Sequence, residues 1–435
     1  MHQPGLRQSL GVTHATAMVV GTIIGASIFA QPSEIAQHVP NGTGILVVWL
    51  GAGILTLFGA LICAELTSAF PRTGGVYVFL KESWGAPVGF LWGWAMLWGM
   101  HTGIIAIVAM IFARYTAVLI PMDPSLTPIL AVAVIVLLSA VNYVGVRHGG
   151  LVQNVFTGAK LAAIVAIIAA GLFWSGAAPA ESAVETAPGV RPFFLAVAAA
   201  LFAYGGWHMV TYTAGETRDA GRTIPRALLF GTLIVTLAYA GLNTIYLHVL
   251  PLGVVQTSRH VAADAADVVL GGGGASLMAA LVMVSTFGAV NGIILVGPRV
   301  YYSMAQDGLL FRWLGAVHPS FGTPARAIAI QAIGASILAL TNTYTALVSR
   351  VIYTEWIFFA IMAAGLLRLR ARPDYRPTYR IWGAPLLVSC FILGSLVVVA
   401  VQIFEKPMNS AAGLGIVLAG LPVYLLWSQR SGAGR

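Results

Sequence analysis

Apolar runs long enough to cross a membrane recur along nearly the whole chain of 435 residues. A membrane-spanning α-helix needs about 20 predominantly apolar residues, and windows of that length are separated here by short polar, proline or glycine connections. We count twelve runs: residues 12–36, 45–69, 86–113, 128–146, 152–174, 192–213, 227–249, 276–302, 325–340, 345–369, 385–404 and 411–427. Strands of a membrane barrel would instead alternate over about ten residues. The sequence therefore predicts an all-α membrane protein with twelve transmembrane helices.

Charged residues make up only 9% of the chain, whereas a soluble domain carries about a quarter. No polar stretch is long enough for a separate soluble domain, so we expect residues 1–435 to form one membrane domain. The net charge is +9, but the basic residues are spread singly between apolar runs and form no contiguous patch. The expected partner is therefore the lipid bilayer and not a nucleic acid.

The distribution of basic residues predicts the orientation of the chain. If the N-terminus is cytoplasmic, about 18 of the 23 lysine and arginine residues lie on or toward the cytoplasmic side, as the positive-inside rule requires. The first ten residues are polar and the first apolar run lacks a cleavage site, so we expect the first helix to be retained. These features predict a multi-pass protein of the cell membrane with both termini in the cytoplasm.

Two of the apolar runs contain small-residue clusters where a membrane helix is expected to break. Gly25-Ala26-Ser27 lies near the middle of the first run, and Gly205-Gly206 lies at the middle of the sixth. Glycine- or proline-interrupted segments in corresponding halves are the best sequence pointer to the binding site of a secondary transporter. The pattern predicts a repeat of five helices at about residues 10–175, a second at about 190–370, and two extra helices at about 383–428.

Unwound backbone inside a membrane is tolerated only where it is buried in protein or lines a cavity, because each unsatisfied amide in hydrocarbon costs several kcal/mol. Backbone N–H groups at the first break, with the positive end of the helix that follows, suit a carboxylate, and carbonyls at the second break suit an ammonium. Together the two breaks indicate an amino acid zwitterion. Close packing of small residues between helices is the alternative explanation for any single glycine.

Several motifs, in order along nearly the whole chain, resemble those of one transporter family. The motifs are Gly21-Thr-Ile-Ile-Gly25, Ala64-Glu-Leu66 with Pro71-Arg-Thr-Gly-Gly-Val-Tyr77, Val155-Phe-Thr-Gly-Ala-Lys160-Leu, Phe202-Ala-Tyr-Gly-Gly-Trp207, Phe287-Gly-Ala-Val-Asn-Gly292 and Arg376-Pro-Thr-Tyr-Arg-Ile-Trp-Gly-Ala-Pro385. The sequence resembles the L-type amino-acid transporters and their bacterial relatives in the amino acid/polyamine/organocation superfamily. The resemblance implies two inverted five-helix repeats with broken first and sixth helices, and transport by alternating access.

The resemblance also implies a substrate site at the two breaks. In the family, backbone amides at positions matching Gly25 to Ile28 hold the substrate carboxylate, carbonyls matching Phe202, Ala203 and Gly205 hold its amine, and the aromatic matching Phe202 closes the outer gate. The candidate substrate-binding residues here are Ile24, Gly25, Ala26, Ser27, Ile28, Phe202, Ala203, Tyr204, Gly205, His208 and Trp356. Family members commonly read Gly-Ser/Thr-Gly in the first break, whereas this chain reads Gly-Ala-Ser. That departure keeps amines without a carboxylate open as substrates.

Lys160 lies 8 residues after the start and 14 before the end of the fifth run, which places it well inside the membrane. An ammonium there costs at least about 2.5 to 3.5 kcal/mol, so it must meet polar groups or lose its proton. Ser285 and Thr286 are its candidate partners. The matching lysine of the family approaches the site where related transporters bind sodium, which predicts a cation surrogate and sodium-independent transport. Proton symport through Lys160 and a fixed structural charge remain the alternatives.

Three further ionisable side chains lie in or beside the apolar runs. His208 follows the second break, where it is expected to contact the substrate or sense pH, or to be a packing histidine. Glu355 precedes Trp356, which is expected to border the side-chain pocket, and an ion pair with Arg350 is the expectation for this carboxylate. Glu65 lies near the cytoplasmic end of the second run, where we expect a structural salt bridge or capping contact.

Other classes of function lack a motif in this sequence. There is no Walker A motif, no dinucleotide-binding glycine fingerprint and no metal-ligand spacing, so neither an enzyme nor a cofactor nor a metal is expected. Cys63 and Cys390 lie in apolar runs and predict no disulfide framework. In animal members of the family a cysteine between the third and fourth helices attaches a heavy chain; residues 114–127 contain none, so no covalently attached heavy chain is expected.

The predicted function is secondary active transport of amino acids, neutral ones since no carboxylate is convincingly placed for a cationic side chain. Exchange and proton symport both remain open. An amine or polyamine carrier of the same fold is the first alternative. A membrane receptor that binds a ligand without moving it is the second, although the short loops leave a signalling partner little surface to contact.

Overall fold

The computed structural model of the chain describes residues 10–25, 27–174, 176, 189–258, 260–342 and 344–432; the side chains of residues 146–152, 344–346, 348–353 and 429–432 lie outside this description. Throughout these residues the regular structure is helical, apart from one isolated bridge between Leu10 and Thr217. The prediction of an all-α protein is therefore confirmed.

The helices follow one another with short connections. In chain order they are α1 (Val12–Ile23), α2 (Ser27–His38), α3 (Gly42–Ala69), α4 (Val76–Trp84), α5 (Ala86–Ala95), η1 (Met96–Met100), α6 (His101–Leu119), η2 (Pro124–Leu126), α7 (Thr127–Val144), α8 (Val146–Leu172), α9 (Val190–Ala203), η3 (Trp207–Glu216), α10 (Ala220–Val249), α11 (Leu252–Thr257), α12 (Val261–Leu270), α13 (Gly274–Val296), α14 (Pro298–Gln306), η4 (Arg312–Gly315), α15 (Ala325–Thr341), α16 (Tyr344–Arg370), α17 (Ala384–Glu405) and α18 (Pro407–Gly432).

Nine stretches of helix within the described residues are long and apolar enough to cross a membrane, and the bent pair α1–α2 makes a tenth if it is counted as one span. One of the nine, Ala86–Leu119, contains the π-helical turn η1 between α5 and α6. α15 is a shorter apolar helix of 17 residues, and α16 has 27 residues. These two helices occupy the ranges expected for the ninth and tenth spans. The protein is thus a multi-pass membrane protein, and the predicted number of twelve spans stays a prediction.

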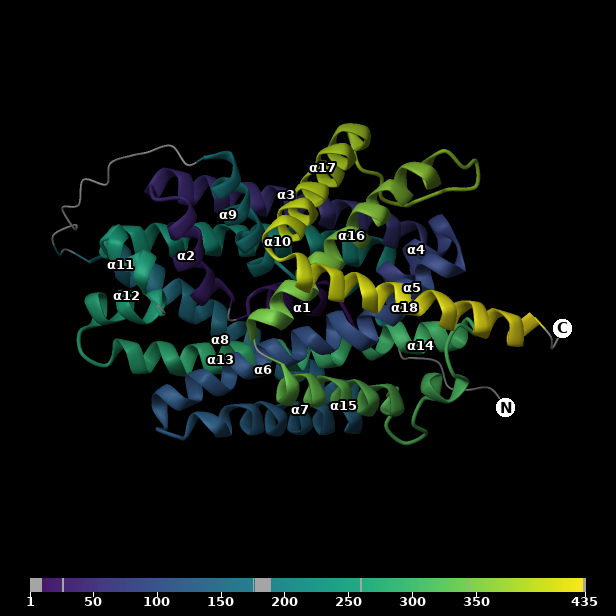
Figure 1. Ribbon diagram of the computed structural model, residues 1–435, viewed down its shortest axis with the longest axis horizontal. Coiled ribbons are helices and arrows are strands. Elements are labelled where there is room, and N and C mark those ends of the chain that lie inside the picture. Colours follow the sequence, from purple (N-terminus) through teal and green to yellow (C-terminus); the bar gives the residue numbers. More distant parts are fainter. Residues whose placement is uncertain are drawn as a thin grey trace.

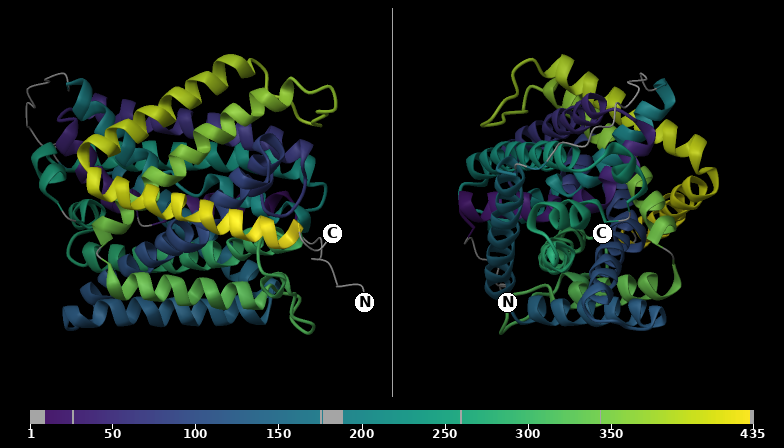
Figure 2. Two further views of the ribbon diagram at one scale, coloured as in Figure 1. Left: turned by 45° about the vertical axis from the view of Figure 1, so that its right-hand side comes forward. Right: turned by 90° about the vertical axis from the view of Figure 1, so that its left-hand side faces the viewer.

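The long helices form a bundle in which the helices nearest the two expected breaks are enclosed. α7 and α15 pack side by side along one edge of the bundle, at the bottom of Figure 1, while α17 and α18 lie on its outside in both views of Figure 2. α1 contacts α8, α10, α13 and η3. The first break therefore lies in the interior of the bundle, where α1 packs against η3, the helix that follows the second break.

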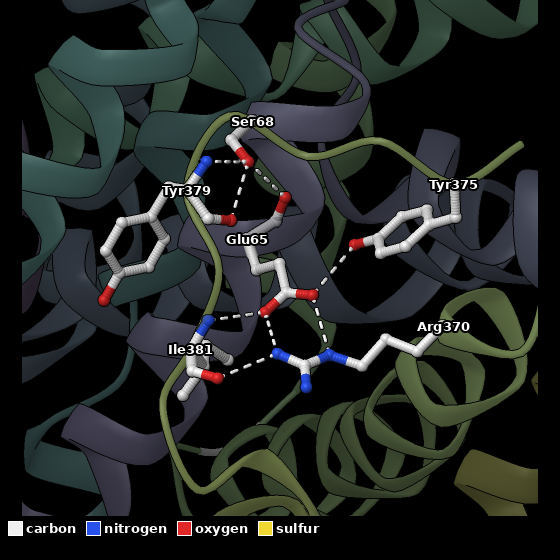
Figure 3. A network of polar contacts seen from close by, with 6 residues as sticks. All are labelled: Glu65, Ser68, Arg370, Tyr375, Tyr379 and Ile381. Carbon is white, nitrogen blue, oxygen red and sulfur yellow. Dashed lines mark hydrogen bonds and ion pairs between the residues drawn. The ribbon is translucent and has the colours of Figure 1, made fainter.

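A network around Glu65 holds the end of α3 against the segment that follows α16 (Figure 3). The Glu65 carboxylate is fully buried and accepts hydrogen bonds from Arg370 Nε at 2.8 Å and from the backbone N–H of Ile381 at 2.8 Å. Nearby, the Ser68 hydroxyl contacts the backbone of Tyr379. The predicted structural salt bridge of Glu65 is confirmed, and its partner is 305 positions away along the chain.

Candidate substrate-binding site

The first helix breaks at the small-residue cluster. α1 ends at Ile23 and α2 begins at Ser27, and the axes of the two helices differ by 46°. The backbone N–H of Gly25 donates to the carbonyl of Ile23 at 2.8 Å in a tight turn, and Ala26 lies outside the described residues. Because the first N–H groups of a helix have no partner within it, the start of α2 presents backbone donors at this point. This is the arrangement that an anionic group requires.

The second break lies opposite the first. α9 ends at Ala203, residues 204–206 form a turn, and η3 continues as a 3₁₀ helix from Trp207. Gly206 has a φ of +98°, which favours glycine, and a Cβ at this position would lie 2.8 Å from the carbonyl oxygen of Thr22. The Thr22 hydroxyl in turn donates to the carbonyl of Gly206 at 3.2 Å. The two breaks therefore touch through their backbones.

We expect Gly206→Ala to slow transport by about tenfold or more, because a left-handed alanine costs about 1–2 kcal/mol and its methyl group would also push Thr22 away. Gly271→Ala is a matched control, since Gly271 also has a positive φ, +77°, but a methyl group added there would meet no atom within 4 Å. Initial uptake rates into proteoliposomes and thermal unfolding in detergent compare the two variants. Equal effects of both substitutions would contradict a special role for the close approach.

Tyr239 of α10 joins the two breaks, and no sequence motif pointed to it. Its hydroxyl lies 3.2 Å from the carbonyl oxygen of Ile23 and 3.0 Å from that of Ala203, and its ring packs on Trp49 and Tyr204. The sequence feature that could have identified Tyr239 is its position inside an apolar run, because a buried phenol needs a hydrogen-bond partner. The contact also means that the Ala203 carbonyl, expected to hold the amine, already accepts a hydrogen bond.

Lys160 of α8 connects the first break to α13. Its buried ammonium donates to the carbonyl oxygens of Gly21 at 3.1 Å, Ile24 at 2.6 Å and Ser285 at 3.2 Å. The Ser285 hydroxyl itself donates to the carbonyl of Gly25 at 3.2 Å. The hydroxyl of Thr286 instead donates to carbonyls of its own helix, so of the two expected partners the structure brings only Ser285 to the lysine.

A cavity of about 50 Å³ lies between the two breaks. On this measure one ordered water needs about 10–15 Å³, so the cavity suits a few waters or a small solute. Five of the predicted substrate-binding residues line the cavity: Gly25, Ser27, Phe202, Gly205 and Trp356. The lining also includes residues that were not predicted, among them Thr22, Ile23, Gly206 and apolar side chains of α6, α13 and α16. Ile24, Ile28, Ala203, Tyr204 and His208 are buried but are not part of the lining.

Glu355 also lines this cavity, although the sequence predicts only a structural ion pair for it. The side chain of Arg350, its expected partner, lies outside the described residues. Glu355 Oε1 lies 4.0 Å from Nε2 of His208, whose ring packs behind the cavity wall against Trp207 and Phe359. The structure thus adds an acidic group to an otherwise largely apolar wall.

The similarity of this chain to known proteins identifies its family. A family model described as amino acid permease matches residues 10–426. The chain belongs to the amino acid permease family. The permease is therefore a membrane transporter of amino acids and not an enzyme, as predicted.

Three relatives of the permease are similar over nearly its whole length. The serine/threonine exchanger SteT of Bacillus subtilis (strain 168) is 34% identical over 431 residues, which cover 98% of each chain. The large neutral amino acids transporter small subunit 2 of Mus musculus is 30% identical, over 97% of this chain and 81% of the relative. The Asc-type amino acid transporter 1 of Homo sapiens is 30% identical, over 97% and 82% of the two chains.

Proposed function

We propose that this permease exchanges small neutral amino acids across the cell membrane by alternating access and without sodium. The observation that carries the proposal is the position of Lys160, whose ammonium donates to Gly21, Ile24 and Ser285 and so supplies a fixed positive charge between the first break and α13. A protonated lysine at this position would take the place of a metal ion from solution. The name of one relative, a serine/threonine exchanger, supports exchange and a small substrate.

The two breaks suit the two charged ends of an amino acid. The backbone donors at the start of α2, beside Gly25 and Ser27, would hold the carboxylate. The amine would meet the backbone of the second break near Phe202 and Gly205, which line the cavity. The cavity of about 50 Å³ favours a small side chain over a large one.

Alternating access would come from movement of the broken helices against the rest of the bundle. We expect residues 10–175 and 190–370 to act as two inverted repeats that meet at the cavity, with α17 and α18 outside them. The excess of lysine and arginine on one side supports cytoplasmic termini and a cell-membrane location.

An amine or polyamine carrier is the second candidate, and the carboxyl group of Glu355 in the cavity wall favours it. Such a substrate would place a cationic nitrogen against Glu355 and would need no carboxylate. Strong competition by putrescine or agmatine, with none by neutral amino acids, would replace the first proposal with this one.

Purified permease in proteoliposomes tests the proposal. We expect uptake of labelled serine or alanine only when the vesicles contain an unlabelled neutral amino acid, at the same rate in sodium chloride and in choline chloride. Uptake driven by a proton gradient into vesicles without internal amino acid would show symport instead. If no amino acid enters under any of these conditions, the proposal is wrong.

A further inference from the structure

The cavity wall contains one acidic side chain that the recognition of an amino acid backbone does not use. Glu355 lies on α16 beside Trp356, on a different helix from the two breaks, and is about 6% exposed. Around it the wall is apolar, with Ile104, Ile107 and Phe359 among its members. A carboxyl group in such surroundings is costly unless something pairs with it.

Within the described part of the chain, one oxygen of this buried carboxyl group lacks a hydrogen-bond partner. Its Oε1 atom makes no hydrogen bond there, and neither ring nitrogen of His208 makes one. The two residues face each other at 4.0 Å, which exceeds the length of a direct hydrogen bond. Buried polar groups without a partner are rare in native proteins, and each one in a cavity wall indicates a ligand or a water that completes it.

We propose that Glu355 forms a side-chain subsite that selects amino acids carrying a hydroxyl group, such as serine and threonine. A hydroxyl both donates and accepts, so it can pair with the carboxyl group in either protonation state. A methyl group in the same place would leave the buried carboxyl group unpaired. A second ammonium would pair only with the ionised form and would bring a further charge into an apolar cavity.

The size of the cavity supports the same assignment. At about 50 Å³ it is small, and its lining includes both the break residues Gly25 and Gly205 and the side chain of Glu355. Threonine and valine have nearly the same shape and differ in whether one branch is a hydroxyl or a methyl group. A site built to bind a hydroxyl discriminates such a pair through the unpaired polar group and not through volume.

This inference rests on the proposed function, and comparison of threonine with valine tests it in proteoliposomes preloaded with serine. We expect wild-type kcat/KM for threonine to exceed that for valine by about tenfold or more. Glu355→Leu should bring the ratio close to 1, and Glu355→Gln, which keeps an acceptor but no charge, should give an intermediate ratio. Because both substrates are measured on the same preparation, the ratio does not depend on how much of a variant folds.

Glu405→Gln is the matched control, since this carboxylate pairs with Arg191 at the surface and should leave the ratio unchanged. Equal wild-type transport of threonine and valine would overturn the subsite while leaving amino acid exchange intact, whereas transport of neither would overturn the proposed function itself. An unchanged ratio in Glu355→Leu would also overturn the subsite. If Glu355→Leu lost only proton-driven uptake, Glu355 would be assigned to proton transfer and the subsite would be overturned. If Glu355→Leu instead lost transport of putrescine, Glu355 would be assigned to binding an amine, which would also overturn the subsite.

Discussion

Replacement of Lys160 by alanine is expected to reduce exchange by at least about 100-fold. The ammonium donates three hydrogen bonds, to carbonyls of Gly21, Ile24 and Ser285, and alanine would leave all three oxygens without that donor in the middle of the membrane. A hydrogen bond to a charged group contributes about 1.5–3 kcal/mol, so the loss of two already corresponds to a factor of 100 or more in rate. The first break would lose its attachment to α8, while the hydrogen bond from the Ser285 hydroxyl to the Gly25 carbonyl would remain.

Lys406→Ala is the matched control for this change, because Lys406 is exposed at the end of α17. Counterflow of labelled serine measures the rate, and size-exclusion chromatography in detergent reports whether each variant is folded. A folded Lys160→Ala protein with wild-type exchange would contradict the proposed role of the lysine. A variant whose activity returns with added sodium would support it directly, since the metal ion would then replace the ammonium.

Separation of the ion pair between Glu216 and Arg299 is expected to cost about 3–5 kcal/mol of stability. Their side chains are only 3% and 1% exposed, with Nε to Oε1 at 2.8 Å and Nη2 to Oε2 at 3.1 Å. The pair connects the end of η3 with the start of α14. Glu216→Gln leaves the buried Arg299 guanidinium without its charged partner, and Arg299→Met leaves the buried Glu216 carboxylate without its donors.

The double variant tests this explanation. Since it contains neither buried charge, it should be more stable than the sum of the two single effects predicts. Thermal unfolding of all four proteins in detergent gives the comparison. Additive losses would mean that the two side chains stabilise the bundle independently and that their pairing contributes nothing.

Features that depend on local sequence were predictable. The apolar runs gave the helices because a membrane span needs a fixed length of apolar residues, and the small residues at 25–27 and 205–206 gave both breaks. The position of Lys160 in its run predicted burial among polar groups, and the structure supplies them. The predicted roles of these residues in substrate binding stay predictions.

Features that depend on contacts between distant segments could not be predicted. Tyr239 meets Ala203 and Ile23 only because α10 packs against both broken helices, and no spacing in the sequence contains that information. The same holds for Arg370 as the partner of Glu65. For Glu355 the sequence indicates a structural ion pair because an arginine lies nearby along the chain, and it places only the neighbouring Trp356 at the pocket. Whether the Glu355 side chain also enters the cavity wall depends on how α16 packs in the bundle.

The contacts between the two breaks affect how other small metabolites in a cell compete with the substrate for the binding site. Thr22 and Gly206 hold the two broken segments together, and Tyr239 contacts both. A short fatty acid or a simple monoamine has only one of the two charged groups and would bind only one of these segments. Because the two segments are joined, that molecule would have to displace both of them while forming contacts with only one. Rejection of such half-substrates is thus expected to come from the backbone frame of the binding site, before any side-chain pocket is filled.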